Sequence, residues 1–304
     1  MDNKDKYFKY KYKYLDLKNN LNIDQQGGNM NDGSTNWGNK SDVLDEVAKD
    51  GLVLEFASPA LQNDIEVVKK AIEQNPQTYM YASPEIRATD YSIALDVVKK
   101  EGELIQYVPK ELWDYELTKA AIESSPFSFR HFDEDTQNNE QLVLAAVQKD
   151  GKTYEILLPK FKNKKFALAA VSQDGNAIQY VDKTIIDDQI ALIAVANNGL
   201  SLRYVPKELR NDTICETAVS QNGDAIQFVN DRDNFLLVSK SIENNGSNIK
   251  YASKRLKNNR ELGLKAVLND GYALGYLSSR LREDLQIVLT ALLKNIKSNT
   301  KFIP

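Results

Sequence analysis

The chain has 304 residues, a formal net charge of −4 at pH 7, 42% hydrophobic residues and 27% charged residues. This composition is ordinary for a folded protein, and the acidic balance argues against an obligate nucleic-acid binder. With one cysteine, Cys215, and one histidine, His131, the chain has no internal disulfide and no zinc site of the Cys/His type. No apolar run reaches the length of about eighteen residues that spans a membrane, and the N-terminus lacks the apolar core of a secretion signal.

Residues 1–22 form a leader of unusual composition. Residues 1–20 carry six lysines against three aspartates, and "YFKYKYKYLDLKNN" begins at Tyr7. As a strand, the leader would place alternate tyrosines on one face. As a helix, it gives an apolar stripe at 3,4,3,4 spacing, which we favour because the pattern runs longer: Tyr7, Tyr10, Tyr14, Leu17 and Leu21.

Two binding roles for the leader remain open at this point. Lysines among tyrosines are suited to nucleic acid, through phosphate neutralisation and stacking, or to an anionic membrane surface. Six lysines offset by three aspartates give only a modest charge for either role. Residues 23–41, rich in Asn, Gly, Ser and Asp, read as a flexible linker.

The rest of the chain, residues 42–304, is repetitive. Glycines stand 24 residues apart at Gly151, Gly175, Gly199 and Gly223, and the series continues with one-residue slips. An Asp or Asn precedes each apolar helical segment and is expected to cap it. These residues are Asp64, Asp90, Asp114, Asn139, Asn163, Asp187, Asp212, Asn234, Asn259 and Asp284.

Each repeat then reads as a long helix, a stop, and a short broken helix. We expect the glycine to end the long helix in the left-handed conformation. An aromatic residue follows five positions later and reads as a repeated core position rather than a ligand cage: Phe56, Tyr107, Tyr180, Tyr204, Phe228, Tyr251 and Tyr276. Since neither helix can bury its apolar face alone, neighbouring repeats must stack. The sequence predicts an all-α solenoid of ten to eleven units with eleven long helices.

The repeat pattern G-x-A-L-x-Y-V-x-x-x-L-x-x-D-x-x-x-x-x-A-V resembles the short helical repeats of a family described as a domain of unknown function. The resemblance covers most of residues 42–297 and is best in 164–229. It implies the fold and transfers no activity, because none is established for the family.

The leader resembles the Y-L-K-Y-K-x-K-Y-L-x-L-K element found at the termini of many giant-virus proteins. Phe8 replaces its leucine. The resemblance implies a packaging or processing tag, and Gly27-Gly28 resembles a viral protease site with Gly28-Asn29 as the bond cut; a plain linker is the alternative. The matching positions are Tyr7, Lys9, Tyr10, Lys11, Lys13, Tyr14, Leu15, Leu17 and Lys18.

We find no pattern of catalytic residues, so we expect no enzyme, no cofactor and no small-molecule substrate. A base at His131 oriented by Asp133 or Asp135 is conceivable, but a packed or exposed histidine fits its turn segment better. Cys215 lies inside a long helix at a position that is apolar in other repeats, which indicates a buried thiol.

Two irregular repeats offer a candidate edge for a protein partner. One presents acids and the next presents lysines, and stacking would bring such segments to one side of the array. Pairing of the acids with the lysines is the simpler interpretation. The residues are Asp133, Glu134, Asp135, Lys160, Lys162, Lys164 and Lys165.

Together these patterns predict a non-catalytic protein-interaction scaffold of a giant-virus particle. A cytoplasmic adaptor in the infected cell is the alternative, and a nucleic-acid-binding solenoid would need a basic stripe that the acidic body does not supply.

Overall fold

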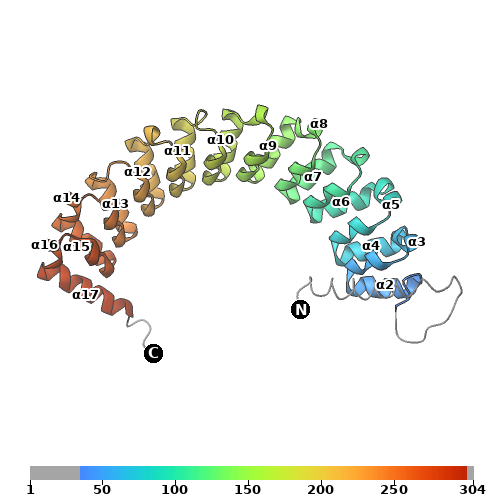
Figure 1. Ribbon diagram of the computed structural model, residues 1–304, viewed down its shortest axis with the longest axis horizontal. Helices are drawn as coiled ribbons and strands as arrows, with labels where there is room; N and C mark the ends of the chain where they lie inside the picture. Colours follow the sequence, from blue (N-terminus) through green and yellow to red (C-terminus); the bar gives the residue numbers. More distant parts are fainter. Residues whose placement is uncertain (1–34, 300–304) are drawn as a thin grey trace, which may run out of the picture. The chain divides into compact units, whose positions relative to one another are not determined.

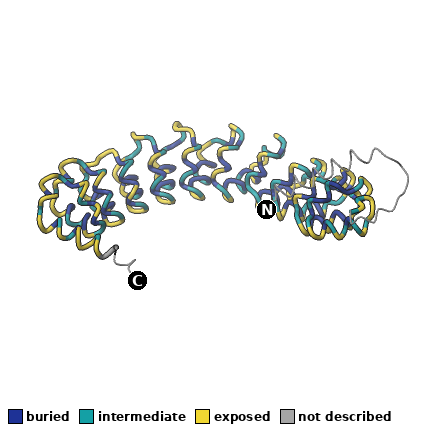
Figure 2. The backbone as a smooth tube through the Cα atoms, turned by 60° about the horizontal axis from the view of Figure 1, so that its bottom comes forward, coloured by how far each residue is buried: buried dark blue, intermediate teal, exposed yellow. Residues whose placement is uncertain are grey.

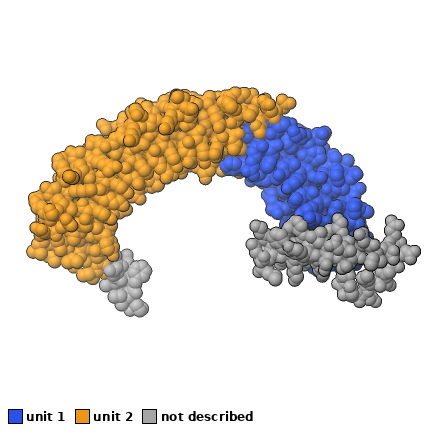
Figure 3. All heavy atoms as spheres, in the orientation of Figure 1, with its two compact units in different colours: residues 1–133 blue, residues 134–304 orange. Residues whose placement is uncertain are grey.

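The computed structural model describes residues 35–299, without the side chains of 297–299. Every regular element in this range is a helix, as predicted (Figure 1). The chain divides into two compact units, residues 1–133 and 134–304 (Figure 3). Within each unit, consecutive repeats lie side by side in chain order.

Eleven long helices occur in the described range, which confirms the predicted number. All but the last have ten residues. The first unit contains α2 (Lys40–Lys49), α4 (Ile65–Gln74), α6 (Tyr91–Lys100) and α7 (Tyr115–Ser124). The second contains α9 (Glu140–Lys149), α10 (Lys164–Gln173), α11 (Asp188–Asn197), α12 (Asp212–Gln221), α13 (Phe235–Asn244), α15 (Arg260–Asn269) and α17 (Leu285–Asn299).

A six-residue 3-10 helix follows each long helix up to α15. In the first unit these are η1 (Gly51–Phe56), η2 (Pro76–Tyr81), η3 (Gly102–Tyr107) and η5 (Pro126–His131). In the second they are η6 (Gly151–Ile156), η8 (Gly175–Tyr180), η9 (Gly199–Tyr204), η11 (Gly223–Phe228), η12 (Gly246–Tyr251) and η13 (Gly271–Tyr276).

Most repeats then close with one short helical turn before the next long helix. These turns are α3 (Pro59–Gln62), α5 (Pro84–Thr89), η4 (Lys110–Leu112), α8 (Glu134–Gln137), η7 (Pro159–Phe161), η10 (Lys207–Leu209), α14 (Lys254–Lys257) and α16 (Ser279–Arg282).

The long helices begin at Asp or Asn caps, as the sequence predicts, with one correction. The Asp64 carboxylate accepts hydrogen bonds from the amides of Glu66 and Val67 at 3.0 and 3.3 Å, and nine of the ten predicted residues take this position. Asp212 does not: the cap of α12 is Asn211, whose Oδ1 accepts from Ile214 N. Asp212 instead occupies the first turn, where its charge suits the helix dipole.

The predicted role of the glycines is wrong. The residue that ends each long helix is the preceding Asp, Asn, Glu or Ser in an extended conformation, as Asn198 is before Gly199 (φ −143°, ψ 108°). No glycine at these positions has a positive φ. Glycine is required instead by close packing, because a Cβ on Gly199 would lie 2.3 Å from the carbonyl oxygen of Ala218 in the next repeat.

The same contact recurs through both units. In each case the partner is the carbonyl of the seventh residue of the following long helix, at 2.1–2.5 Å from the added Cβ. The pairs are Gly51–Ala71, Gly102–Ala121, Gly151–Ala170, Gly175–Ala194, Gly199–Ala218, Gly246–Ala266 and Gly271–Ala291. The residue whose carbonyl meets the glycine is alanine in all seven pairs.

Most long helices contribute four buried positions to the core, beside buried residues of the 3-10 helices such as Leu202. In α11 these are Ile190, Ala191, Ala194 and Val195, all fully buried. The third and seventh positions face the preceding repeat, and the fourth and eighth face the following one. Buried segments therefore run between the stacked repeats, with exposed residues at the outer turns (Figure 2). Burial of these side chains is the main stabilising term.

Candidate functional site

The second unit carries a ladder of half-buried aromatic side chains along its stacked 3-10 helices. In η9 the first, third and fourth residues are buried, so Arg203 faces solvent and Tyr204 is half-buried. Neighbouring 3-10 helices pack against each other, which repeats this position at every step. The prediction of a core position holds for Phe56 in the first unit but not for Tyr107, which is half-buried. The ladder residues also remain partly accessible: Tyr180, Tyr204, Phe228, Tyr251 and Tyr276.

Cationic side chains lie over two of these rings. The Arg203 guanidinium carbon is 4.5 Å from the centroid of Tyr204, and Lys250 Nζ is 4.8 Å from that of Tyr251. Each cation is the residue just before its aromatic, so the pair forms locally. Cation–π attraction at exposed sites contributes about 0.5–1 kcal/mol. The ladder thus presents aromatic faces and positive charge together.

Arg210 forms hydrogen bonds to the main chain of two successive repeats of the ladder. Its Nη1 donates to the carbonyl of Phe228 at 2.6 Å, and its Nε donates to that of Val205 at 3.0 Å. Burial lowers the pKa of Arg210 from its usual value. Sequence reasoning missed this residue. The signal available was its place directly after "YVPKEL", a hexapeptide that occurs at residues 107–112 and again at 204–209. After the first copy, Trp113 donates in the same way to the Val108 carbonyl at 3.1 Å.

His131 belongs to a polar cluster centred on Glu103 in the first unit. His131 Nε2 lies 2.7 Å from Glu103 Oε2, Arg130 Nη2 donates to the same oxygen at 2.8 Å, and Ser125 Oγ donates to Oε1 at 3.2 Å. Burial raises the pKa of Glu103, but the hydrogen bonds from His131 and Arg130 outweigh it and leave that pKa below its usual range. Glu103 therefore contacts the Ser125 hydroxyl through one carboxylate oxygen and His131 through the other.

Cys215 is buried on α12, as predicted. Its Sγ lies 3.5 Å from the Arg210 carbonyl, and burial raises the pKa of its thiol, so the reactive thiolate is disfavoured.

The candidate partner edge is distributed over both units. Asp133 closes the first unit and lies 3.7 Å from Lys110, while Glu134 and Asp135 begin α8 in the second. Lys164 and Lys165 form ion pairs with Asp187 and Glu140 in the adjacent repeats.

The other two lysines of the edge have contacts within their own repeat. Lys160 lies over the Phe161 ring, 4.8 Å from its centroid, and Lys162 donates to the Glu155 carbonyl at 2.8 Å. All four lysine contacts are local or lead to the adjacent repeat. The function of this edge remains a prediction.

The leader and the candidate processing site Gly27, Gly28 and Asn29 lie outside the described residues. Within residues 35–299, no group of three or more His, Cys, Asp or Glu side chains is placed to hold a metal ion. No helix in the same range is both long and apolar enough to cross a membrane.

The fold and the ladder define an all-α helical-repeat protein. A family model described as "Domain of unknown function (DUF4116)" matches six times, and the chain belongs to this family. The matched segments are residues 46–87, 90–137, 139–186, 187–232, 234–278 and 264–304. No curated protein and no solved structure matches the chain significantly.

Proposed function

We propose that the chain is a non-catalytic scaffold that binds another protein along the aromatic ladder of its second unit. The observation that carries this proposal is the repetition of half-exposed rings, with Arg203 and Lys250 over Tyr204 and Tyr251. Tyrosine and arginine are enriched at the centres of protein interfaces, because they combine large apolar area with polar groups. Stacked repeats make such a surface long, which suits an extended partner segment.

Rigidity of the ladder supports the same proposal. Arg210 fixes the main chain of two successive repeats through hydrogen bonds to the carbonyls of Val205 and Phe228. The rings on fixed main chain lose less conformational entropy on binding than rings on a mobile loop. The acidic body and the absence of a basic stripe in the sequence favour a protein partner over nucleic acid.

A capture experiment with the full chain tests the ladder. We expect Arg203→Glu and Lys250→Glu together to weaken partner capture from infected-cell extract by at least about 30-fold, because both cations would become repulsive. The matched control is Leu236→Ala with Lys240→Ala, two exposed positions on α13 away from the ladder. Equal loss in the control, or no loss in the ladder variant, would contradict the proposal.

The setting of this function is also part of the proposal. The likeness of the leader to giant-virus elements supports a particle component whose leader is a packaging or processing tag, with Gly28-Asn29 as the bond cut. Peptide mass mapping of the native protein from purified particles tests this directly. A chain that begins at Asn29 supports a removed tag, and an intact N-terminus supports a retained binding element. Absence from particles would contradict the particle component and favour the cytoplasmic adaptor.

A further inference from the structure

A row of positive charges lies on the turns that lead into α13, α15 and α17 in the second unit. Arg232, Lys257 and Arg282 each stand two residues before the cap of the following long helix. The Ser253 amide donates to the Arg232 carbonyl at 2.8 Å. In the next repeat, the Ser278 amide donates to the Lys257 carbonyl at 3.0 Å. Equivalent positions of successive turns therefore lie next to one another.

A positive charge at this position is not needed for the repeats to stack. In front of the other eight long helices of the described range, the residue two positions before the cap is uncharged. These residues are Trp37, Gln62, Ala88, Leu112, Gln137, Phe161, Ile185 and Leu209. The hydrogen bond to the next turn forms without the charge, as at Trp37, whose carbonyl accepts from the Ser58 amide at 2.9 Å. The fold therefore does not explain the three cations.

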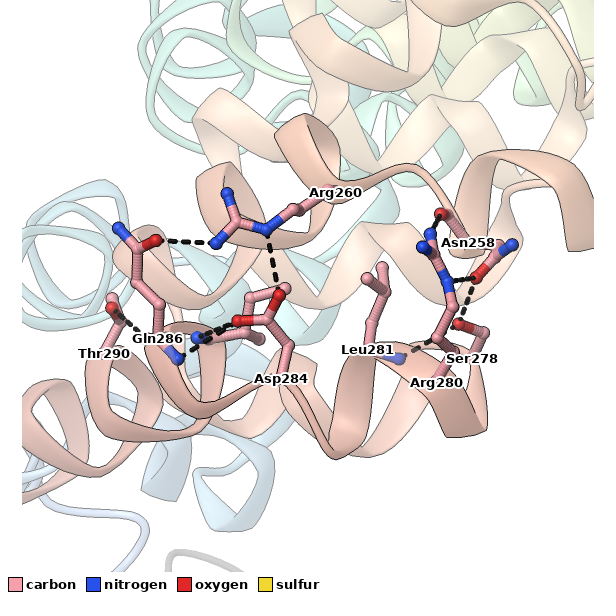
Figure 4. Close-up of polar contacts among 9 residues, drawn as sticks. Asn258, Arg260, Ser278, Arg280, Leu281, Asp284, Gln286 and Thr290 are labelled. Carbon is pink, nitrogen blue, oxygen red and sulfur yellow. Dashed lines mark hydrogen bonds and ion pairs between the residues drawn. The ribbon is translucent and has the colours of Figure 1, made fainter.

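Two arginines on the same turns make matching contacts but differ in how far their charge is compensated. Arg255 donates from Nε to Oδ2 of Asp233 at 2.8 Å and from Nη2 to the Asp233 carbonyl at 3.1 Å. One repeat later, Arg280 makes the same two bonds to Asn258, at 3.0 and 2.9 Å (Figure 4). The Asp233 carboxylate neutralises Arg255, whereas the neutral amide of Asn258 leaves the charge of Arg280 uncompensated.

Five cations of these turns form what we call the basic row: Arg232, Lys254, Lys257, Arg280 and Arg282. None of the five forms an ion pair within residues 35–299. All are exposed except Lys257, which is half-buried. The carboxylates of Asp231 and Glu283 stand beside Arg232 and Arg282 and interrupt the row. The row nevertheless carries an excess of positive charge in a chain whose net charge is −4.

We propose that the basic row binds an acidic segment of a protein partner. The contact between Arg255 and Asp233 shows the chemistry, because one guanidinium binds a carboxylate and the main-chain carbonyl of the same residue. A nucleic acid fits less well. It carries a negative charge on every nucleotide, and Asp231 and Glu283 would repel it. This surface is separate from the rings of the ladder, and the proposal does not depend on them.

Fluorescence anisotropy of the full chain with a labelled peptide of alternating Glu and Gly tests the proposal. We expect binding that weakens as salt is added, and no binding of the same peptide with Gln in place of Glu. Lys257→Glu with Arg282→Glu should raise the Kd at least about 10-fold. The matched control is Lys152→Glu with Lys183→Glu, which changes the net charge equally at exposed lysines of earlier repeats and should leave the Kd nearly unchanged.

An exchange between Asn and Asp provides variants that leave every cation in place. Asn258→Asp gives Arg280 the carboxylate that Arg255 already has, and we expect the Kd to rise about 3- to 5-fold. Asp233→Asn releases the charge of Arg255 and should lower the Kd by a similar factor. The fold accepts either residue, because Ser253 Oγ donates to Asp233 and Ser278 Oγ donates to Asn258 at 2.7 Å. Circular dichroism should show equal helix content.

Three results would overturn the proposal. The first is a wild-type chain that does not bind the Glu peptide, or binds an oligothymidylate of equal charge more tightly. The second is an unchanged Kd in the variant Lys257→Glu with Arg282→Glu, since the peptide would then bind elsewhere, as on the lysine-rich leader. The third is an equal loss in the control variant, which would show that only the net charge of the chain matters. Because the peptide has no aromatic residue, failure of the ladder would not affect the outcome.

Discussion

Gly199 and Ala218 are in direct backbone contact across two successive repeats, so close that a Cβ on Gly199 would lie 2.3 Å from the Ala218 carbonyl oxygen. The Gly199 amide also donates to Oε1 of Gln221 at 2.6 Å, and Nε2 of Gln221 donates back to the Asn197 carbonyl at 3.3 Å. One glycine and one amide side chain therefore join neighbouring repeats through backbone packing and paired hydrogen bonds.

Substitution of the packed glycine should destabilise the protein. We expect Gly199→Ala to cost about 1–3 kcal/mol, because the added methyl group must push the Ala218 backbone away. Gly275→Ala is the control, since a Cβ there meets nothing within 4 Å. It should change stability by less than about 0.5 kcal/mol. Urea unfolding followed by circular dichroism measures both, and equal midpoints for the two variants would refute the packing argument.

The side-chain amide of Gln221 should contribute to the stability of the fold independently of the packing at Gly199. Gln221→Ala leaves the Gly199 amide without its partner, and we expect a loss of about 1 kcal/mol. Gln179, an exposed residue of η8, provides the comparison, and Gln179→Ala should be nearly neutral. Amide hydrogen exchange at Gly199 gives a local readout, which should speed up in the Gln221 variant only. Unchanged exchange would mean that water replaces the side chain without cost.

A charge pair at the start of the long helices predicts how stability depends on pH. Lys164 pairs with the cap Asp187 at 2.5 Å, and Arg260 pairs with the cap Asp284 at 2.9 Å. The hydrogen bond from Lys164 lowers the pKa of Asp187, and the one from Arg260 lowers that of Asp284, below their usual 3.8. The folded state then binds fewer protons than the unfolded state. These groups stabilise the fold above about pH 3.8, and the contribution is lost as the pH falls through the folded pKa.

Replacing these two aspartates with neutral caps should make the stability of the fold depend less on pH in the acidic range. Asparagine still accepts the amide hydrogen bonds of a helix start, so Asp187→Asn with Asp284→Asn preserves both caps. We expect the variant to lose less stability than the wild type as the pH falls from about 5 to about 2.5. This interval lies on both sides of the usual carboxyl pKa of about 3.8. Thermal midpoints across that range provide the measurement. If the thermal midpoints of the two proteins fall in parallel with pH, other carboxylates control the loss of stability in acid.

The four lysines of the candidate partner edge allow a test of binding without a large loss of stability. Lys164 and Lys165 are 51% and 60% exposed in their ion pairs, and exposed pairs contribute little, about 0–1 kcal/mol. Replacing Lys160, Lys162, Lys164 and Lys165 with Ala should therefore change the melting temperature by a few degrees at most, and it should abolish partner capture only if the partner docks on this edge and not on the ladder alone. Unchanged capture would remove this edge from consideration.

The charges at the starts of successive long helices follow a pattern in the sequence, which the structure shows by bringing these residues together. Where the first residue of a long helix is basic, the cap of the next helix is Asp: Lys40 with Asp64, Lys164 with Asp187, and Arg260 with Asp284. Where the first residue is acidic, the next cap is Asn: Glu140 before Asn163, Asp188 before Asn211, and Asp212 before Asn234. Asparagine avoids the like-charge repulsion that Asp would meet there.

The all-α class, the eleven long helices of the described range and nearly all of their caps could be predicted from the sequence, because helix periodicity and capping depend on residues a few positions apart. The role of the glycines, the partial exposure of Tyr204 and the exposure of Leu292 on α17 could not be predicted in this way. Each depends on what lies against the residue from a repeat about 24 positions away, or on no described repeat lying there, as at Leu292. A sequence period predicts that repeats stack, but which atoms meet depends on how the side chains of neighbouring repeats pack.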